Sequence, residues 1–140
     1  MDVAKVAKKL IRIHKTNNPF EIIKGMNVIL VFCPLEGIRG FYQRFQRNNI
    51  IYIDERLSEK EKIFVCAHEL GHMLLHRNTN FIFMDTRTQL NSDKYEIEAD
   101  RFAMELLISD VDLIEYKEYS LEQLSRIFGY HEKLIRLRLQ

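Results

Sequence analysis

The stretch Ser58–His76, SEKEKIFVCAHELGHMLLH, decides how this chain folds. Ser58 is followed three residues later by Glu61, a capping box that is typical of the start of an α-helix. The apolar run Ile63-Phe64-Val65 comes directly after it, and a second run, Met73-Leu74-Leu75, lies near the end of the stretch. The sequence therefore predicts one long and substantially buried helix here.

Two histidines of this helix, His68 and His72, lie four residues apart and so project from one face, one turn from each other. Imidazoles placed in this way can bind a single metal ion, and Glu69 between them can reach a water on that ion and act as general base. The alternative is a partly exposed helix with ordinary polar histidines. The apolar runs on both sides favour burial instead, and buried histidines and carboxylates need partners.

A catalytic zinc usually has three protein ligands and one open position, so a third ligand is expected. His76 follows His68 by eight residues, which is about 12 Å along a helix. Both cannot bind an ion that lies about 2 Å from each ligand. The position of His76 favours a cap at the end of its own helix, facing the negative end of the helix dipole.

A second long helix is predicted over residues 94–107 and contains Glu96 and Glu98. Because these glutamates are two residues apart, they point to nearly opposite faces. Alternating charge, typical of a solvated face, marks the stripe formed by Lys94, Glu98, Arg101 and Glu105. Glu96 and Asp100 belong to the other stripe, where small residues permit close approach to another helix.

Glu96 could also be the third residue of a helix that Asp93 caps, but Asp100 on the same face is then unexplained. Both acids are explained if Glu96 is the third ligand and Asp100 accepts the free ring N–H of a ligand histidine. The sequence therefore predicts a zinc site formed by His68, His72 and Glu96.

The remaining sequence predicts an α+β fold. Helices are expected over residues 3–14, from Asn18-Pro19, after Ser109-Asp110, and over residues 121–128 and 132–139. Strands are expected over Asn27–Cys33, Phe41–Phe45 and Ile50–Ile53, with Asn48-Asn49 as a hairpin turn. Residues 78–92 are expected to be irregular around the apolar patch Phe81–Met84. We expect one domain over residues 1–140, with helices packed on a small, mainly antiparallel three-stranded sheet.

Composition limits the class of protein. The chain has 140 residues, is 46% apolar and carries a net charge of +1, which is typical of a globular domain and gives no general argument for nucleic-acid binding. The two cysteines, Cys33 and Cys66, do not form a disulfide framework. The longest apolar run, Val28–Cys33, is far shorter than the roughly 20 residues of a membrane span. We expect a cytoplasmic protein without membrane segments.

Residues 120–139 have the form of a helix-turn-helix, with Gly129 at the turn and three basic residues, Lys133, Arg136 and Arg138, in the second helix. One interpretation is a DNA-binding unit; the other is a helical hairpin packed on the core, with its basic residues in water. Three cations are few beside the phosphate contacts of specific DNA-binding proteins. The packed hairpin is favoured, and direct nucleic-acid binding is not expected.

HELGHMLLH at 68–76, followed by YEIEADRFAMELL at 95–107, closely resembles the ImmA/IrrE family of zinc metallopeptidases. The hairpin before these blocks and the helix pair after them fit the resemblance too. It implies a zincin-like, more closely gluzincin-like, core in which His68, His72 and Glu96 match the ligand positions and Glu69 the catalytic base. The chain departs from the family's common Leu-Leu-Met-Pro at residues 106–109, in a turn that leaves the metal site untouched.

The resemblance also implies a role, because such proteins often belong to phages and mobile elements and inactivate a helix-turn-helix repressor, by cleavage or otherwise. We expect that repressor as substrate, docked at the sheet edge beside the zinc helix. The competing hypothesis is a zinc-containing regulator that binds DNA or protein without proteolysis. Glu69 favours the peptidase, since a structural zinc needs no base. The sequence does not identify the group that stabilises the oxyanion; Tyr95, Tyr116 and His131 are candidates.

Overall fold

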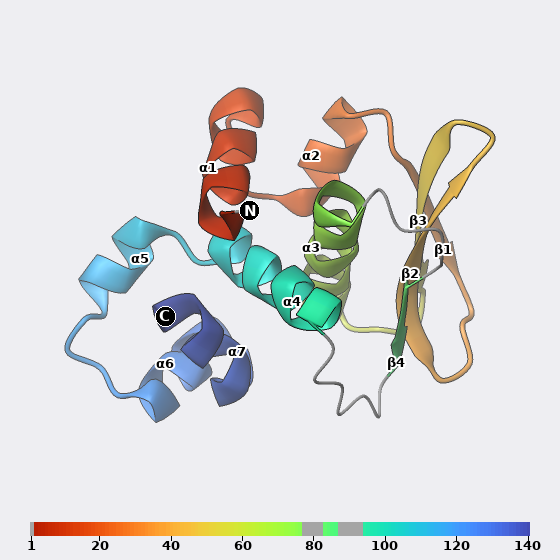
Figure 1. Ribbon diagram of the computed structural model, residues 1–140. Helices are drawn as coiled ribbons and strands as arrows, with labels where there is room; N and C mark the ends of the chain where they lie inside the picture. Colours follow the sequence, from red (N-terminus) through yellow and green to blue (C-terminus); the bar gives the residue numbers. More distant parts are fainter. Residues whose placement is uncertain (1, 77–82, 87–93) are drawn as a thin grey trace.

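The computed structural model describes residues 2–76, 83–86 and 94–140, and of residues 83–86 it describes the backbone. The helices are α1 (Val3–His14), α2 (Pro19–Gly25), α3 (Glu59–Leu75), α4 (Lys94–Leu107), α5 (Asp110–Glu115), α6 (Leu121–Phe128) and α7 (Glu132–Leu139). The strands are β1 (Ile29–Cys33), β2 (Ile38–Phe45), β3 (Asn48–Asp54) and β4 (Phe83–Thr86). The α+β prediction is confirmed, as are all the predicted helices (Figure 1).

The sheet has the strand order β1-β3-β2-β4. Strand β1 runs parallel to β3, with Ile29 opposite Ile50, while β2 is antiparallel to both β3 and β4. The three predicted strands are present and the sheet is mainly antiparallel, as expected. The sequence does not predict strand β4, which falls in the segment expected to be irregular. Most of that segment lies outside the described residues, as does the proposed cap Asp93. Four residues of an edge strand carry too little alternation to be predicted.

The hairpin turn lies two residues earlier than the sequence predicts. Gln46 and Arg47 form it, with φ angles of 49° and 68°, whereas Asn48 and Asn49 are paired residues of β3. Two left-handed residues suit the twist of a two-residue hairpin. Asn49 also accepts a hydrogen bond from the hydroxyl of Tyr42 at 2.7 Å, so this asparagine stabilises the strand pair instead of the turn.

Helix α3 is the central layer of the molecule. It packs against β2 and β3 on one side and against α4 on the other, and Figure 1 shows it between the sheet and α4. Ile51 and Ile53 of β3, Leu70 of α3 and Phe102 of α4 are fully buried at these contacts. This arrangement explains why α3 is buried on more than one face, as its two apolar runs predict.

Gly71 permits the close approach of α3 to α4. A Cβ atom at this position would lie 3.1 Å from Cδ1 of Phe102 and 3.3 Å from Cα of Ala99, which is tighter than ordinary van der Waals contact. The small residues expected at this contact, Ala99 and Ala103, are buried. Because Gly71 lies directly before His72, the tight contact occurs at the turn that carries the predicted metal ligands.

The C-terminal helix pair packs on α4, through contacts between α4 and α7. Arg138 is buried: its Nε donates to the carbonyl of Ile108 at 2.9 Å, and its guanidinium pairs with Glu105 and Asp110. In the described residues, α7 therefore lies against α4 and α6. The expectation that all three basic residues lie in water is wrong for Arg138, because a long side chain at this position reaches across to the end of α4.

Among the described residues, no helix combines the length and the apolar character that crossing a membrane requires.

Candidate metal centre

The site begins with the start of α3, which the predicted capping box fixes. The side chain of Ser58 accepts from the backbone N–H of Glu61 at 3.2 Å, and the Glu61 carboxylate accepts from the N–H of Ser58 at 3.2 Å. Each bond satisfies a donor that the first turn of a helix leaves without a partner. From this start, the helical repeat directs His68 and His72 toward α4, where their side chains are almost completely buried.

Glu96 of α4 lies between the two histidines. Its Oε2 is 2.9 Å from Nε2 of His68, and its Oε1 is 2.9 Å from Nε2 of His72. One ligand atom from each of the three residues lies within 4.8 Å of the other two, a group that could hold a metal ion. Two imidazole nitrogens and one carboxylate oxygen are a donor set that catalytic zinc sites use. The convergence that the sequence predicts for these residues is therefore present.

Asp100 lies one turn after Glu96, as predicted, and its Oδ1 is 2.8 Å from Nδ1 of His68. Since a carboxylate accepts, Nδ1 of His68 donates this hydrogen bond. The ring nitrogen that remains, Nε2, is the one that faces Glu96. Asp100 thus holds the His68 ring with its second nitrogen directed into the site.

The electrostatics of the three residues favour a cation among them. Burial alone lowers the pKa of His68, but its hydrogen bonds to Asp100 and Glu96 outweigh burial, and the pKa lies well above its ordinary value. Burial raises the pKa of Glu96, but the bonds from His68 and His72 outweigh it and lower the pKa. Burial lowers the pKa of His72, against the opposing bond to Glu96. Glu96 is therefore an anion, and binding of a metal would displace protons from the histidines.

Glu69 lies in the same buried turn of α3 and is fully inaccessible to solvent. Its negative charge acts on His68 and Cys66. It contributes to the raised pKa of His68. Burial raises the pKa of the Cys66 thiol, and Glu69 adds to this effect. Glu69 is thus a fully buried carboxylate whose charge acts on the neighbouring His68.

His76 and Glu98 take part in the site in a way that the sequence analysis missed. His76 is the C-cap residue of α3, as predicted. Its ring, however, is buried, with Nδ1 2.9 Å from Nδ1 of His72 and Nε2 3.1 Å from Oε1 of Glu98. The expectation that Glu98 lies on a solvated face is therefore wrong: it is half-buried, because α3 reaches across to that side of α4. The spacing of four residues between His72 and His76 could have revealed this contact.

The three candidates for an oxyanion group have different surroundings. The Tyr95 ring lies edge-on to the His76 ring, with centroids 4.6 Å apart. His131 is the N-cap of α7, where its Nδ1 accepts from the backbone N–H of Lys133. Tyr116 packs edge-on against two other aromatic rings. Tyr95 thus packs on His76, which contacts His72, while the other two candidates take part in helix capping and packing.

Comparisons with known proteins agree with this geometry. A peptidase family described as the IrrE N-terminal-like domain matches residues 23–140. The chain is 40% identical over 134 residues to a phage protein named uncharacterized immunity region protein 2, from Bacillus phage phi105, covering 94% of this chain and 85% of that protein. It is 32% identical over 128 residues to the metallopeptidase ImmA of Bacillus subtilis (strain 168), covering 87% of this chain and 75% of that protein.

The family match spans most of the chain and includes both helices of the buried His68–His72–Glu96 group. The chain is therefore a member of the ImmA/IrrE family of metallopeptidases.

Proposed function

We propose that this metallopeptidase is a cytoplasmic zinc enzyme that cleaves a helix-turn-helix repressor of a phage or mobile element. The observation that carries the zinc assignment is the convergence of His68, His72 and Glu96, whose ligand atoms lie within 4.8 Å of one another. Two nitrogens and one carboxylate oxygen suit zinc better than magnesium or calcium, which prefer sites made of oxygen alone.

In the proposed mechanism, the three residues His68, His72 and Glu96 would hold the metal. When bound, zinc lowers the pKa of water and polarises the carbonyl group of the scissile peptide bond. Glu69 takes the proton of the attacking water and gives it to the leaving amine nitrogen. Asp100 keeps the His68 ring oriented through its hydrogen bond to Nδ1.

The repressor is proposed as substrate on two grounds. The family resemblance implies it, and a relative with 40% identity is named as an immunity region protein of a phage. For docking, we propose the open side of β4, because this edge strand lies between the two ligand helices in the chain and pairs with β2, which contacts α3. An extended peptide can add to such an edge as a further strand. The apolar patch Phe81–Met84, proposed to contact the partner, lies outside the described side chains.

The alternative function is a zinc-containing regulator that binds DNA through α6 and α7. Its electrostatic support is weak, since Arg138 is buried in ion pairs with Glu105 and Asp110 and cannot contact phosphate without breaking them. Lys133 and Arg136 are the exposed cations of α7. Two cations are few for specific binding to DNA.

The test is co-expression of the chain with the helix-turn-helix repressor encoded beside it, with the repressor followed by immunoblot. We expect the wild type to cleave the repressor at one site and the Glu69→Gln variant to leave it intact. Casein, an unstructured protein, serves as the control substrate and should remain nearly uncut. A repressor that stays intact and active beside the wild type in cells where the element is induced would refute the peptidase assignment to this substrate and favour the regulator.

A further inference from the structure

We propose that His76 and Glu98 are positioning residues for His72: together they fix its ring hydrogen on Nδ1 and so leave Nε2 to bind the metal. This inference rests on the proposed function of the site as a zinc centre. It concerns a second chain of hydrogen bonds, separate from the pair formed by His68 and Asp100.

This series of hydrogen bonds begins at Glu98, the residue farthest from the ligand atoms. An ionised carboxylate can only accept hydrogen bonds, so the contact of 3.1 Å between Oε1 of Glu98 and Nε2 of His76 places a hydrogen on that nitrogen. The other ring nitrogen of His76, Nδ1, faces His72. That atom lies 2.9 Å from Nδ1 of His72, and one of two nitrogens at this distance must donate. When Nε2 of His72 binds a metal, the ring hydrogen of His72 is on Nδ1, so His72 is then the donor and His76 the acceptor.

The consequence appears at the other nitrogen of His72. A neutral imidazole that donates from Nδ1 carries a lone pair on Nε2, and Nε2 lies 2.9 Å from Oε1 of Glu96. A metal ion bound between these two atoms would replace the hydrogen that Nε2 of His72 shares with Glu96 in the metal-free structure. The chain from Glu98 thus prepares the acceptor pair of His72 and Glu96 for a metal ion.

The two ligand histidines are then anchored in parallel ways. The ring N–H of His68 reaches Asp100 of α4 directly, at 2.8 Å. The ring N–H of His72 reaches Glu98 of α4 through the ring of His76. A buried His76 fills the distance that a direct hydrogen bond from His72 to Glu98 would have to span. Carboxylates that orient ligand histidines in this way raise metal affinity about 10- to 100-fold.

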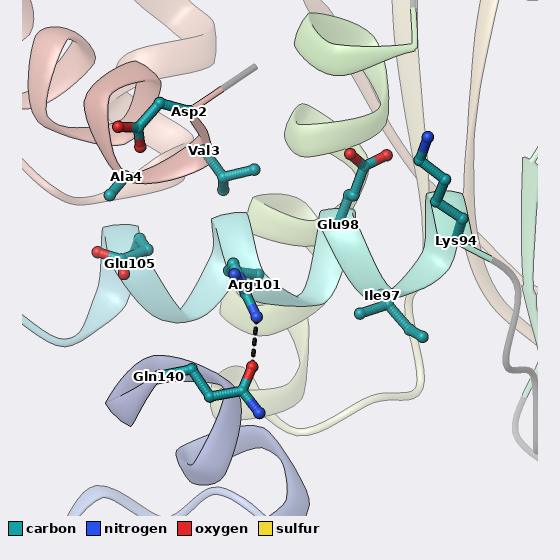
Figure 2. A pocket seen from close by; sticks show the side chains of 9 residues that line it. All are labelled: Asp2, Val3, Ala4, Lys94, Ile97, Glu98, Arg101, Glu105 and Gln140. Atoms are coloured by element: carbon teal, nitrogen blue, oxygen red, sulfur yellow. Dashed lines mark hydrogen bonds between the residues drawn. The ribbon is translucent and has the colours of Figure 1, made fainter.

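The surroundings hold both residues of this chain in place. His76 is 5% exposed, and its ring lies edge-on to Tyr95. Glu98 also lines a cavity of about 590 Å³ that α4 shares with the start of α1 and with Gln140. Figure 2 shows its carboxylate there on the same helix as Lys94 and Arg101.

The test is zinc affinity, measured by competition with a chromogenic chelator. We expect His76→Phe, which keeps a ring but removes the acceptor, to weaken zinc binding about 10- to 100-fold. His76→Gln restores an acceptor oxygen and should recover most of the affinity. Glu98→Gln should weaken binding by less than His76→Phe, because an amide can donate as well as accept and so no longer fixes the hydrogen on His76.

The matched control is Glu105→Gln, the same substitution at a nearly buried carboxylate of α4, which pairs with Arg138 away from the site. Its zinc affinity should equal that of the wild type. As a second readout, long-range proton–nitrogen NMR of the zinc-loaded wild type should show His72 with hydrogen on Nδ1. Glu98→Gln is expected to stay folded. In this variant, NMR should show that the ring hydrogen of His76 is no longer confined to Nε2.

Wild-type zinc affinity in folded His76→Phe or an equal loss in His76→Phe and His76→Gln would overturn the positioning role alone. Absence of zinc binding by the wild type would overturn the zinc centre and, with it, this inference. The two failures are therefore distinguished by the wild-type measurement.

Discussion

Glu69 and Glu96 are both buried carboxylates at the same site, but their neighbours differ. Glu96 contacts Nε2 of both histidines from the opposite helix, while Glu69 is on α3 itself, next to His68 in the chain. A carboxylate that contacts Nε2 of both histidines can be a metal ligand. A carboxylate next to the ligands can instead transfer protons. Substitution should separate these two roles.

We predict that Glu69→Gln keeps about one zinc per chain but loses peptidase activity by a factor of about 10² to 10⁴, the usual contribution of a general base. Glutamine has nearly the same volume, so the buried turn should stay intact. Zinc content and repressor cleavage are measured on the same preparation. Loss of zinc from this variant would mean that Glu69 is a ligand and would contradict its assignment as a base.

For Glu96→Ala we predict a loss of zinc affinity greater than the hundredfold that changes around a ligand produce, because one of three ligands is removed. Glu105→Ala, on the same helix and away from the site, is the control and should retain wild-type affinity. Chelator competition measures both. If Glu98→Ala lost zinc completely while Glu96→Ala kept it, the assignment of the inward face of α4 would be wrong.

At the scale of residues, the sequence predicts what helical geometry alone determines. The spacing of His68 and His72 places both on one face of α3, and the spacing of Glu96 and Asp100 places both on one face of α4. The convergence of these two faces could therefore be predicted. The contact between His76 and Glu98 depends on how α3 and α4 lie beside each other. Charge patterning along α4 carries no information about that arrangement.

Among the elements, the contact between α3 and α4 determines the geometry of the metal group. We predict that Gly71→Val lowers the free energy of unfolding by about 1–3 kcal/mol, the usual cost of overpacking a core, because its side chain would meet Phe102 and Ala99. Zinc affinity should fall as well, since the helices that carry the ligands are forced apart. Chemical denaturation and chelator competition measure the two effects.

The control for this substitution is Lys9→Val at an exposed position of α1, which gives the cost of a β-branched residue in a helix without a clash. Gly71→Val with the stability and zinc affinity of Lys9→Val would show that α3 and α4 tolerate a wider separation at this turn.

Arg138 anchors the C-terminal helix pair to α4. We predict that Arg138→Ala lowers the free energy of unfolding by about 3 kcal/mol, because it leaves the nearly buried carboxylate of Glu105 without its partner. Arg136→Ala, an exposed change two residues earlier, should cost no more than about 0.5 kcal/mol. Equal stability of the two variants in urea denaturation would contradict the anchoring role of Arg138.

The elements also show where sequence patterns lose information. The capping box at Ser58 and the Asn18-Pro19 start are local motifs, and both helices begin where predicted. The hairpin turn at Gln46-Arg47 is not a local preference of these residues. It follows from the register in which Ile51 and Ile53 face the core, which outweighs the turn tendency of Asn48-Asn49.

Across the whole molecule, the sheet, α3 and α4 form successive layers, with the metal group between the second and third (Figure 1). The edge strand β4 lies between the two ligand helices, α3 and α4, in the chain. The α+β class could be predicted from alternating helical and strand patterns. The parallel pairing of β1 with β3 and the edge strand β4 could not, because pairing depends on contacts between distant segments.

The central claim is that His68, His72 and Glu96 form a zinc site, and metal analysis of the purified chain tests it most directly. The protein is expressed without added metal, separated from loosely bound ions and analysed by mass spectrometry against its concentration. We predict about one zinc per wild-type chain. A folded wild-type chain that contains no zinc and acquires none when zinc is added would contradict the claim.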